Sequence, residues 1–125
     1  VICDNMAASL MQHGKVDIII TGCDRVAANG DFANKVGTLS LAINAKHFGV
    51  PFYVAAPSST VDESIPDGSE IIVEQRCGPE ISDYWYSTPM VAPKAKCDYN
   101  PAFDVVPREL ITGFITEKGV TDSIV

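Results

Sequence analysis

The sequence is short of positive charge and has no long apolar run. Its 125 residues hold 9 Lys and Arg against 16 Asp and Glu, a formal net charge of -7. An acidic chain lacks the general electrostatic attraction to phosphate backbones and anionic lipid surfaces. No apolar run approaches the roughly 20 residues that span a bilayer, and no signal-peptide pattern opens the chain. We therefore expect no nucleic-acid partner, no membrane, and a cytoplasmic location, with the nucleus as a second location in a eukaryote.

Closely spaced cysteines are also missing. The four thiols lie far apart in the chain, at Cys3, Cys23, Cys77 and Cys97. Structural zinc sites need Cys or His pairs a few residues apart, so this spacing predicts no metal site. Disulfide frameworks are typical of small secreted domains, and we expect reduced, mostly buried thiols here. The sequence also lacks a Walker loop and a G-x-G-x-x-G motif, which removes two common signatures of nucleotide binding.

What the sequence does have is a composition able to bury a core. Hydrophobic residues make up 46% of the chain and charged residues 20%, and 125 residues is about the length of one ordinary domain. No repeat, low-complexity tract or linker divides the chain. We therefore expect a single domain over residues 1–125. Because the first residue is Val1 rather than Met, we also expect this domain to be a piece of a longer protein.

Helix and strand patterns alternate in the first half of the chain. An apolar stripe after Asp4 predicts a helix that ends at Gly14. The β-branched run 16–21 is typical of a central parallel strand covered on both faces. Residues 33–48 predict a crossover helix and 51–56 the next strand, which completes a parallel βαβ unit. The pattern indicates an α/β fold with a mainly parallel sheet.

The second half gives weaker signals. Residues 57–68 predict a loop and 70–74 a short strand. The proline-rich stretch 75–101 predicts irregular structure packed by aromatic side chains. The aromatic residues inside it are Tyr84, Trp85 and Tyr86. Residues 107–115 predict a final short helix, with a proline in its first turn and a glycine beyond its end.

Asp24 is the first candidate for chemistry. In an open parallel sheet, ligands bind beyond the carboxyl ends of the strands, and the loop after the first predicted strand places Asp24 there. Burial would raise the pKa of Asp24 toward the range of an acid/base catalyst. Pairing with Arg25 would lower that pKa instead. The sequence leaves both situations open.

Asn34 and Lys35 are the second candidate. They fall in the first turn of the predicted crossover helix, where free N–H groups and the helix dipole favour an anion and the Lys35 ammonium adds a full charge. A phosphorylated small molecule fits that arrangement. A purely structural arrangement fits the same spacing: Asp31 caps the helix, Lys35 is solvated, and Asp24 pairs with Arg25 at the surface.

Several other side chains are weaker candidates. Cys23 has no nearby His to activate it, so we expect a packed thiol rather than a nucleophile. His13 and His47 lie at predicted helix ends, where an imidazolium interacts favourably with the helix dipole. Residues 58–60 either bind phosphate or begin a turn. Residues 62–63 are expected to form a solvated face or a cap.

One long stretch resembles a known family. The run 22–31, GCDRVAANGD, followed by ANKVGT at 33–38, closely resembles the signature of the methylthioribose-1-phosphate isomerases. The similarity extends along nearly the whole chain, to 4–8, 51–60, 100–105, 109–112 and 116–120. Members of that family are much longer proteins, and this chain resembles their C-terminal portion, with the N-terminal domain absent.

The resemblance implies a fold and an activity. The fold is a Rossmann-like three-layer sandwich with a mainly parallel sheet. The activity is an aldose-to-ketose isomerisation of methionine salvage without a cofactor, from 5-methylthioribose 1-phosphate to 5-methylthioribulose 1-phosphate. The phosphate on C1 prevents the sugar ring from opening through the usual free aldehyde.

The resemblance also implies residue roles and partners. Asp24 matches the family's catalytic acid/base, and Asn34 and Lys35 match a pair that binds the phosphorylated sugar. The family's catalytic cysteine and phosphate-binding arginine belong to the N-terminal portion, so we expect this chain alone to be inactive. A homodimer is the implied assembly.

Two related functions compete with this interpretation. Ribose-1,5-bisphosphate isomerases share the superfamily, as do the noncatalytic regulatory subunits of the guanine-nucleotide exchange factor of translation initiation. The presence of Asp24 together with Asn34 and Lys35 favours the isomerase, because a scaffold needs no acid/base carboxylate beside an anion site.

Overall fold

The computed structural model describes residues 1–82 and 97–124. In this part of the chain the α-helices are α1 (Ala7–Gln12), α2 (Thr38–Phe48) and α3 (Pro79–Ser82). The strands are β1 (Ile19–Thr21), β2 (Arg25–Ala27), β3 (Phe32–Lys35), β4 (Phe52–Ala55), β5 (Val61–Asp62), β6 (Phe103–Val106), β7 (Gly113–Thr116) and β8 (Gly119–Thr121). Short 3-10 helices are η1 (Asp4–Met6), η2 (Ser58–Thr60), η3 (Gly68–Glu70) and η4 (Arg108–Leu110).

The described strands form two mixed sheets. The first sheet has the order β1-β4-β7-β8, with β1, β4 and β7 parallel and β8 antiparallel to β7. The second sheet has the order β5-β2-β3-β6, in which only the β2–β5 pair is parallel. The α/β fold is therefore confirmed. The Rossmann-like sandwich with a mainly parallel sheet is not confirmed, because both sheets are mixed and three of the six strand pairs of the described residues are antiparallel.

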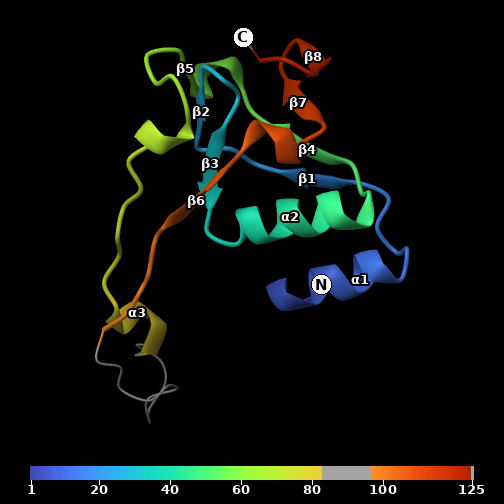
Figure 1. Ribbon diagram of the computed structural model, residues 1–125, viewed down its shortest axis with the longest axis vertical. Helices are drawn as coiled ribbons and strands as arrows, with labels where there is room; N and C mark the ends of the chain where they lie inside the picture. Colours follow the sequence, from blue (N-terminus) through green and yellow to red (C-terminus); the bar gives the residue numbers. More distant parts are fainter. Residues whose placement is uncertain (83–96, 125) are drawn as a thin grey trace.

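The predicted parallel pair is present. β1 lies beside β4 in parallel register, and α2 lies between them in sequence and beneath them in Figure 1. Gly49 ends α2 in the left-handed conformation at φ +69°, where a glycine has no side-chain strain. β1 is nevertheless at the end of the described sheet and not at its centre. Ile20 of β1 and Ile18, the residue just before it, are about half exposed, at 57% and 48%, so only one face of the strand is covered.

The expected crossover helix begins later than predicted. Residues 33–35 belong to β3, which pairs with β2 in an antiparallel hairpin, and α2 begins at Thr38. The turn of the hairpin contains Asn29 and Gly30, and Gly30 adopts φ +88°. Asn-Gly is a strong hairpin signal because it tolerates positive φ. The placement of Asn34 and Lys35 in a helical turn is therefore wrong: both lie in a strand.

Two further predictions are wrong. Residues 70–74 form no strand, because η3 occupies residues 68–70 and the next residues pair with no ladder in the described chain; Ile72 is 95% exposed. The predicted final helix is instead η4 followed by the β7–β8 hairpin. Gly119 closes that hairpin at φ +124°, and β-branched residues flank the turn.

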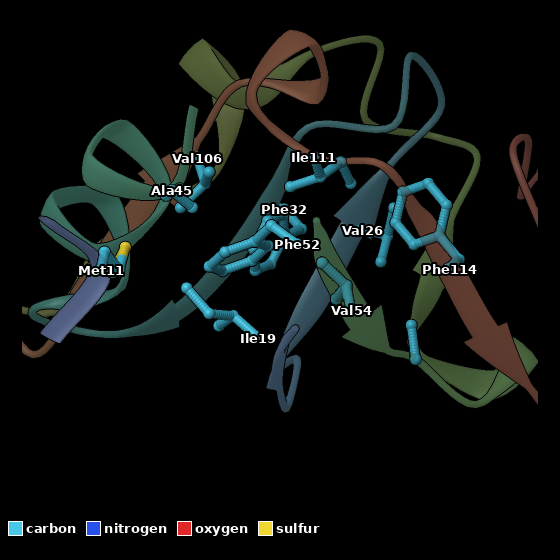
Figure 2. Close-up of a cluster of buried hydrophobic side chains, with 12 residues drawn as sticks. Met11, Ile19, Val26, Phe32, Ala45, Phe52, Val54, Val106, Ile111 and Phe114 are labelled. Carbon is cyan, nitrogen blue, oxygen red and sulfur yellow. The ribbon is translucent and has the colours of Figure 1, made fainter. Parts of the chain in front are cut away.

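The core lies between the two sheets and the helices (Figure 2). Both sheets contribute fully buried side chains, α1 adds the 5% exposed Met11, and α2 adds the small Ala42 and Ala45. The largest are Phe32, Phe52, Phe114, Val26, Val54 and Val106. Burying a side chain of this size contributes about 1.5–3 kcal/mol, so these six fix how the sheets sit against each other.

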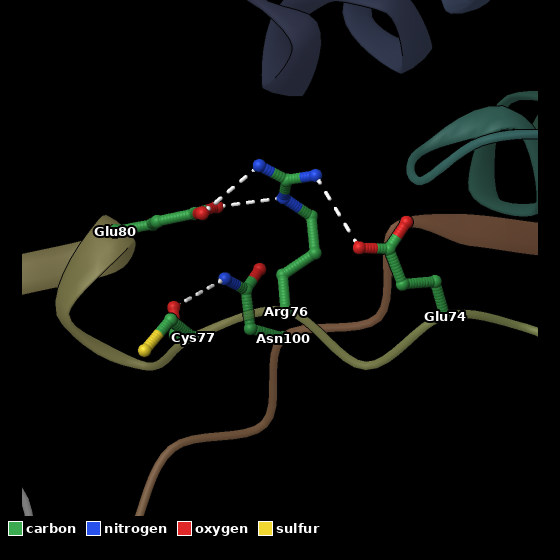
Figure 3. A network of polar contacts seen from close by, with 5 residues as sticks. All are labelled: Glu74, Arg76, Cys77, Glu80 and Asn100. Atoms are coloured by element: carbon green, nitrogen blue, oxygen red, sulfur yellow. Dashed lines mark hydrogen bonds and ion pairs between the residues drawn. The ribbon is translucent and has the colours of Figure 1, made fainter.

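Residues 71–78 lead away from the two sheets to α3, and residues 97–102 lead back to β6 (Figure 1). Gln75 and Pro101 form an isolated antiparallel bridge, and Arg76 donates two hydrogen bonds to Glu80 at 2.7 and 2.9 Å (Figure 3). Residues 75–78 and 97–101 are irregular apart from this bridge, as predicted, whereas residues 79–82 form the helix α3 and the prediction is wrong there. Tyr84, Trp85 and Tyr86 lie outside the described residues, so their packing stays a prediction.

The thiols are free, but most are not buried. Cys3, Cys77 and Cys97 are exposed, and Cys23 alone packs partly against the core. The expectation of mostly buried thiols is therefore wrong. Across residues 1–82 and 97–124, no helix is long and apolar enough to cross a membrane.

Candidate functional site

The carboxyl ends of β1, β4 and β7 meet at one edge of the first sheet. These three strands are parallel, so the residues that follow them, 22–24, 56–60 and 117–118, lie along that edge. Ligands of open parallel sheets bind in such a place. The hydroxyl of Thr21, the last residue of β1, is buried there and has no hydrogen-bond partner among the described residues.

Asp24 is exposed at this edge. Its backbone N–H donates to the Ala33 carbonyl at 2.9 Å, which places it across from Asn34 in the β2–β3 hairpin. In the described part of the chain its carboxylate accepts no hydrogen bond and forms no ion pair. Arg25 pairs instead with Asp62, with Nη1 3.3 Å from Oδ2. Neither burial of Asp24 nor an Asp24–Arg25 pair is therefore present, and the carboxylate is open to an incoming molecule.

Asn34 and Lys35 point to opposite faces of β3, as successive strand residues do. The Asn34 amide donates to the Thr38 hydroxyl at 3.0 Å, and its oxygen lies close to Gly22, just after β1. The exposed Lys35 ammonium lies 4.8 Å from the centre of the Phe103 ring. The structure thus brings Asn34 beside the strand end that carries Asp24 and turns Lys35 away from it.

The N-terminus of α2 cannot serve as the expected anion site. Asp104 of β6 already accepts hydrogen bonds from the N–H groups of Gly37 and Leu39, at 2.7 and 3.0 Å. A carboxylate of the chain itself therefore occupies the positive end of this helix. Sequence reasoning missed this role, since Asp104 caps a helix that begins 66 residues earlier and no local motif records the contact.

Asp31 does not cap the helix as the structural alternative proposed. It accepts hydrogen bonds from the Asn29 amide at 2.9 Å and from the N–H groups of Gly68 and Arg108 at 3.0 and 2.8 Å. Partial burial acts to raise the pKa of Asp31, but these three hydrogen bonds outweigh it and hold the pKa below its usual range. Asp31 therefore joins the β2–β3 turn to two later segments.

Two hollows flank the end of β3. Lys35 lines a hollow of about 790 Å³ between the starts of α1 and α2. Asp24 lines a second hollow, of about 510 Å³. The charged residues of the second hollow are Asp24, Arg25, Asp62, Glu70 and Glu74. The second hollow thus has four carboxylates and one guanidinium, whereas the first has one carboxylate, Asp4, and one ammonium, Lys35, so the second hollow disfavours an anion more strongly than the first.

The weaker candidates have structural roles. Burial raises the pKa of the Cys23 thiol to about 11, against a hydrogen bond with Thr60 that lowers it, so Cys23 is a protonated, packed thiol. Ser58 begins η2, and the Thr60 hydroxyl donates to the Pro57 carbonyl at 2.7 Å. Of the two alternatives for residues 58–60, phosphate binding or a turn, the structure has the turn. Asp62 accepts from both the N–H and the hydroxyl of Ser64, two residues on, and so stabilises a turn; no helix begins there.

The two histidines lie where predicted. His13 follows α1 and contacts the Ser9 carbonyl at 2.7 Å, and His47 is in the last turn of α2. Within residues 1–82 and 97–124, no three His, Cys, Asp or Glu side chains group in a way that could hold a metal ion.

Comparison with known protein families gives the class of protein to which this fold and this sheet edge belong. The chain belongs to the initiation factor 2 subunit family, whose family model matches residues 1–123.

Within this family, the chain is similar to proteins named as sugar-phosphate isomerases. A methylthioribose-1-phosphate isomerase of Parabacteroides distasonis is 56% identical over 119 residues, which cover 95% of this chain and 35% of that protein. A 5-deoxyribose 1-phosphate isomerase of Bacillus thuringiensis serovar kurstaki is 55% identical over 122 residues, 96% of this chain and 34% of that protein. The chain thus spans about a third of the length of these relatives.

Solved structures agree with the fold. The crystal structure of 5-methylthioribose 1-phosphate isomerase from Pyrococcus horikoshii matches with a TM-score of 0.89 and 47% identity, over 96% of this chain and 33% of that one. The structure of translation initiation factor eIF-2B, subunit delta, from A. fulgidus matches with a TM-score of 0.87 and 39% identity, over 95% of this chain and 34% of that one.

Proposed function

We propose that the chain is the C-terminal part of an aldose-ketose isomerase that converts 5-methylthioribose 1-phosphate to 5-methylthioribulose 1-phosphate. The observation that carries the proposal is the open carboxylate of Asp24 at the carboxyl edge of the first sheet, in a chain 54–56% identical to proteins named methylthioribose-1-phosphate isomerase. The eIF-2B subunit delta of A. fulgidus, at 39% identity, is more distant and supports the regulatory alternative less.

Asp24 is the proposed acid/base group. Isomerisation conserves all atoms: the ring opens, one hydrogen moves from C2 to C1, and hydroxyl protons are redistributed. A positioned carboxylate contributes typically 10²–10⁴-fold to such proton transfers. Asp24 is free to do so because none of the described side chains pairs with its carboxylate and it faces a hollow that can hold sugar hydroxyls.

Asn34 and Lys35 are the proposed substrate-binding pair. The Asn34 amide lies beside Gly22 and so reaches the same strand end as Asp24. The Lys35 ammonium is exposed on the other face of β3, beside the larger hollow, and is the charge available to a phosphate. The substrate would then extend around the end of β3, with its anion near Lys35 and its hydroxyls near Asp24.

The Rossmann-like three-layer sandwich is part of the proposal. The face of the first sheet opposite the core carries apolar side chains on all four strands, in the cross-strand rows Ile20–Tyr53 and Ala55–Ile115–Val120. Ile20 and Val120 lie on the two outer strands of this sheet and are 57% and 67% exposed. Exposed apolar side chains that share one face in this way are typical of a surface that another segment or partner covers. An N-terminal portion of a longer protein would cover this face as the third layer.

The proposed assembly is a homodimer, and the proposed location is the cytoplasm. The family resemblance of residues 22–31 and 33–38 supports both, and sedimentation of the complete protein measures the oligomeric state directly. A dimer that persists at nanomolar concentration agrees with the proposal, and a monomer at micromolar concentration contradicts it.

An NMR assay tests the proposed reaction. The complete protein and the 125-residue chain are each incubated with 5-methylthioribose 1-phosphate, and the C2 resonance of the ketose is followed. We expect ketose from the complete protein alone, since the chain spans about a third of its relatives. Binding of the sugar phosphate without turnover by the complete, folded protein would favour the regulatory alternative.

A further inference from the structure

Glu117 joins two loops at the edge where Asp24 lies. It follows β7, and Ser58 follows the parallel neighbour β4. The Glu117 carboxylate accepts a hydrogen bond from the Ser58 N–H at 3.0 Å and a second from the Ser58 hydroxyl. The hydroxyl first, and then the N–H, stabilise the charged form and lower the pKa of Glu117 to about 2. The contact is therefore charge-assisted throughout the neutral pH range.

The turn that Glu117 holds leads to the loop of Asp24. Ser58 and Thr60 belong to η2, and Thr60 closes that turn by donating from its N–H and its hydroxyl to the Pro57 carbonyl, at 2.8 and 2.7 Å. η2 leads directly into β5, whose Val61 and Asp62 pair in parallel with Val26 and Ala27 of β2. β2 begins directly after Asp24, so backbone and side-chain contacts run from Glu117 through η2 and the β5–β2 pair to the residue next to Asp24.

Asp24 depends on such support because little else holds it. Its carboxylate has no hydrogen-bond or ion-pair partner within the described residues, so its direction follows from its backbone. That backbone is held by the Asp24 N–H bond to Ala33 on one side and by the packing of Cys23 on the other. A shift of η2 would also shift β5, and through the β5–β2 pair it would move β2, which begins directly after Asp24.

We propose that Glu117 is a positioning residue for Asp24, acting through Ser58, η2 and the β5–β2 pair. The inference rests on the proposed function for its catalytic meaning. It assigns a role to a residue that contacts neither Asp24 nor the two hollows. Misplacing a reacting group by about 1 Å can cost up to about 10²-fold in rate, so a loosened turn is expected to lower kcat about tenfold.

The test uses the complete protein with Glu117→Gln, Ser58→Ala and both changes together. We expect kcat to fall about tenfold in each, with KM changed less than about twofold and the melting temperature nearly unchanged. The double variant should be no slower than either single variant, because the two residues act as one unit. Glu109→Gln is the matched control, since Glu109 is an exposed carboxylate without a hydrogen-bond partner among the described side chains.

Three outcomes overturn the proposal: an unchanged kcat, a loss confined to KM, or additive losses in the double variant. A second readout separates this inference from the proposed function. Even if the wild-type protein isomerises no sugar phosphate, the backbone amide resonances of Cys23 and Asp24 should shift in Glu117→Gln and not in Glu109→Gln. Unshifted resonances in both variants would show that Glu117 does not position Asp24.

Discussion

Asp31 illustrates how one side chain can join its own turn to two distant segments. Its carboxylate bonds to the hairpin turn through Asn29, to η3 through Gly68 and to η4 through Arg108. Gly30, its neighbour, has no space for a side chain: an added Cβ would lie 2.8 Å from the Arg108 side chain. The glycine is thus required both for its positive φ and for this close approach.

Asp31 should make stability fall at acid pH. Its pKa is lowered in the folded state, so its contribution is present above the unfolded-state pKa of about 4 and is lost as pH falls through the folded value. We expect Asp31→Asn to lower the melting temperature at pH 7 and to flatten its decline between about pH 5 and pH 3. Asp17→Asn, at an exposed carboxylate, is the control and should keep the wild-type slope. An equally steep decline in Asp31→Asn would contradict this assignment.

Cys23 should be the least reactive thiol described. Burial first, and the charge of Asp24 to a smaller extent, raise its pKa to about 11, against the hydrogen bond with Thr60. At pH 8 roughly one thiol in a thousand would then be thiolate. Iodoacetamide labelling followed by peptide mass spectrometry should modify the exposed Cys3, Cys77 and Cys97 before Cys23. Labelling of Cys23 first would contradict the packed-thiol assignment.

At the scale of elements, α2 depends on a cap from another strand. Asp104 of β6 bonds to two N–H groups at the start of the helix, which no residue next to the helix does. We expect Asp104→Ala to lower the free energy of unfolding by about 1 kcal/mol, the usual cost of losing a helix cap. Urea unfolding measures this loss, with Asp17→Ala as the control. Equal stabilities of the two variants would mean that the cap contributes nothing.

Some elements could be predicted from the sequence and others could not. Runs 16–21 and 51–56 contain the parallel strands β1 and β4, because β-branched and apolar residues in such runs have few other stable conformations. The hairpin at 25–35 was missed although Asn29-Gly30 signals it, since good helix formers from Ala33 onward suggested one long helix. Strand β7 was missed because the pattern around Leu110 and Phe114 fits a helix as well as a strand.

The candidate site, too, could be predicted from the sequence only in part. Asp24 at a strand end follows from local sequence alone, because the strand before it is strongly marked. The directions in which the Asn34 and Lys35 side chains point depend on whether these residues lie in a helix or in a strand. Their strand conformation comes with pairing to β6, which is distant in sequence. The bonds of Asp104 and Glu117 join residues 59 to 67 positions apart, and no local pattern records them.

At the scale of the whole molecule, the outer face of the first sheet tests the three-layer proposal. If an N-terminal portion covers that face, Ile20→Glu should destabilise the complete protein by about 2 kcal/mol, because a charge would be buried without a partner. Ile72→Glu is the matched control, since Ile72 is 95% exposed and lies outside the sheets. Thermal unfolding measures both. Tolerance of both changes would contradict a covered face.

The most direct test of the account is the kinetics of Asp24→Asn in the complete protein, with 5-methylthioribose 1-phosphate as substrate. Because Asp24 is exposed and its carboxylate holds no other described side chain in place, the substitution should leave the melting temperature unchanged. We expect kcat to fall at least about a hundredfold, with KM little changed. A kcat close to that of the wild-type protein, or an effect confined to KM, would contradict the role of Asp24 as the acid/base group.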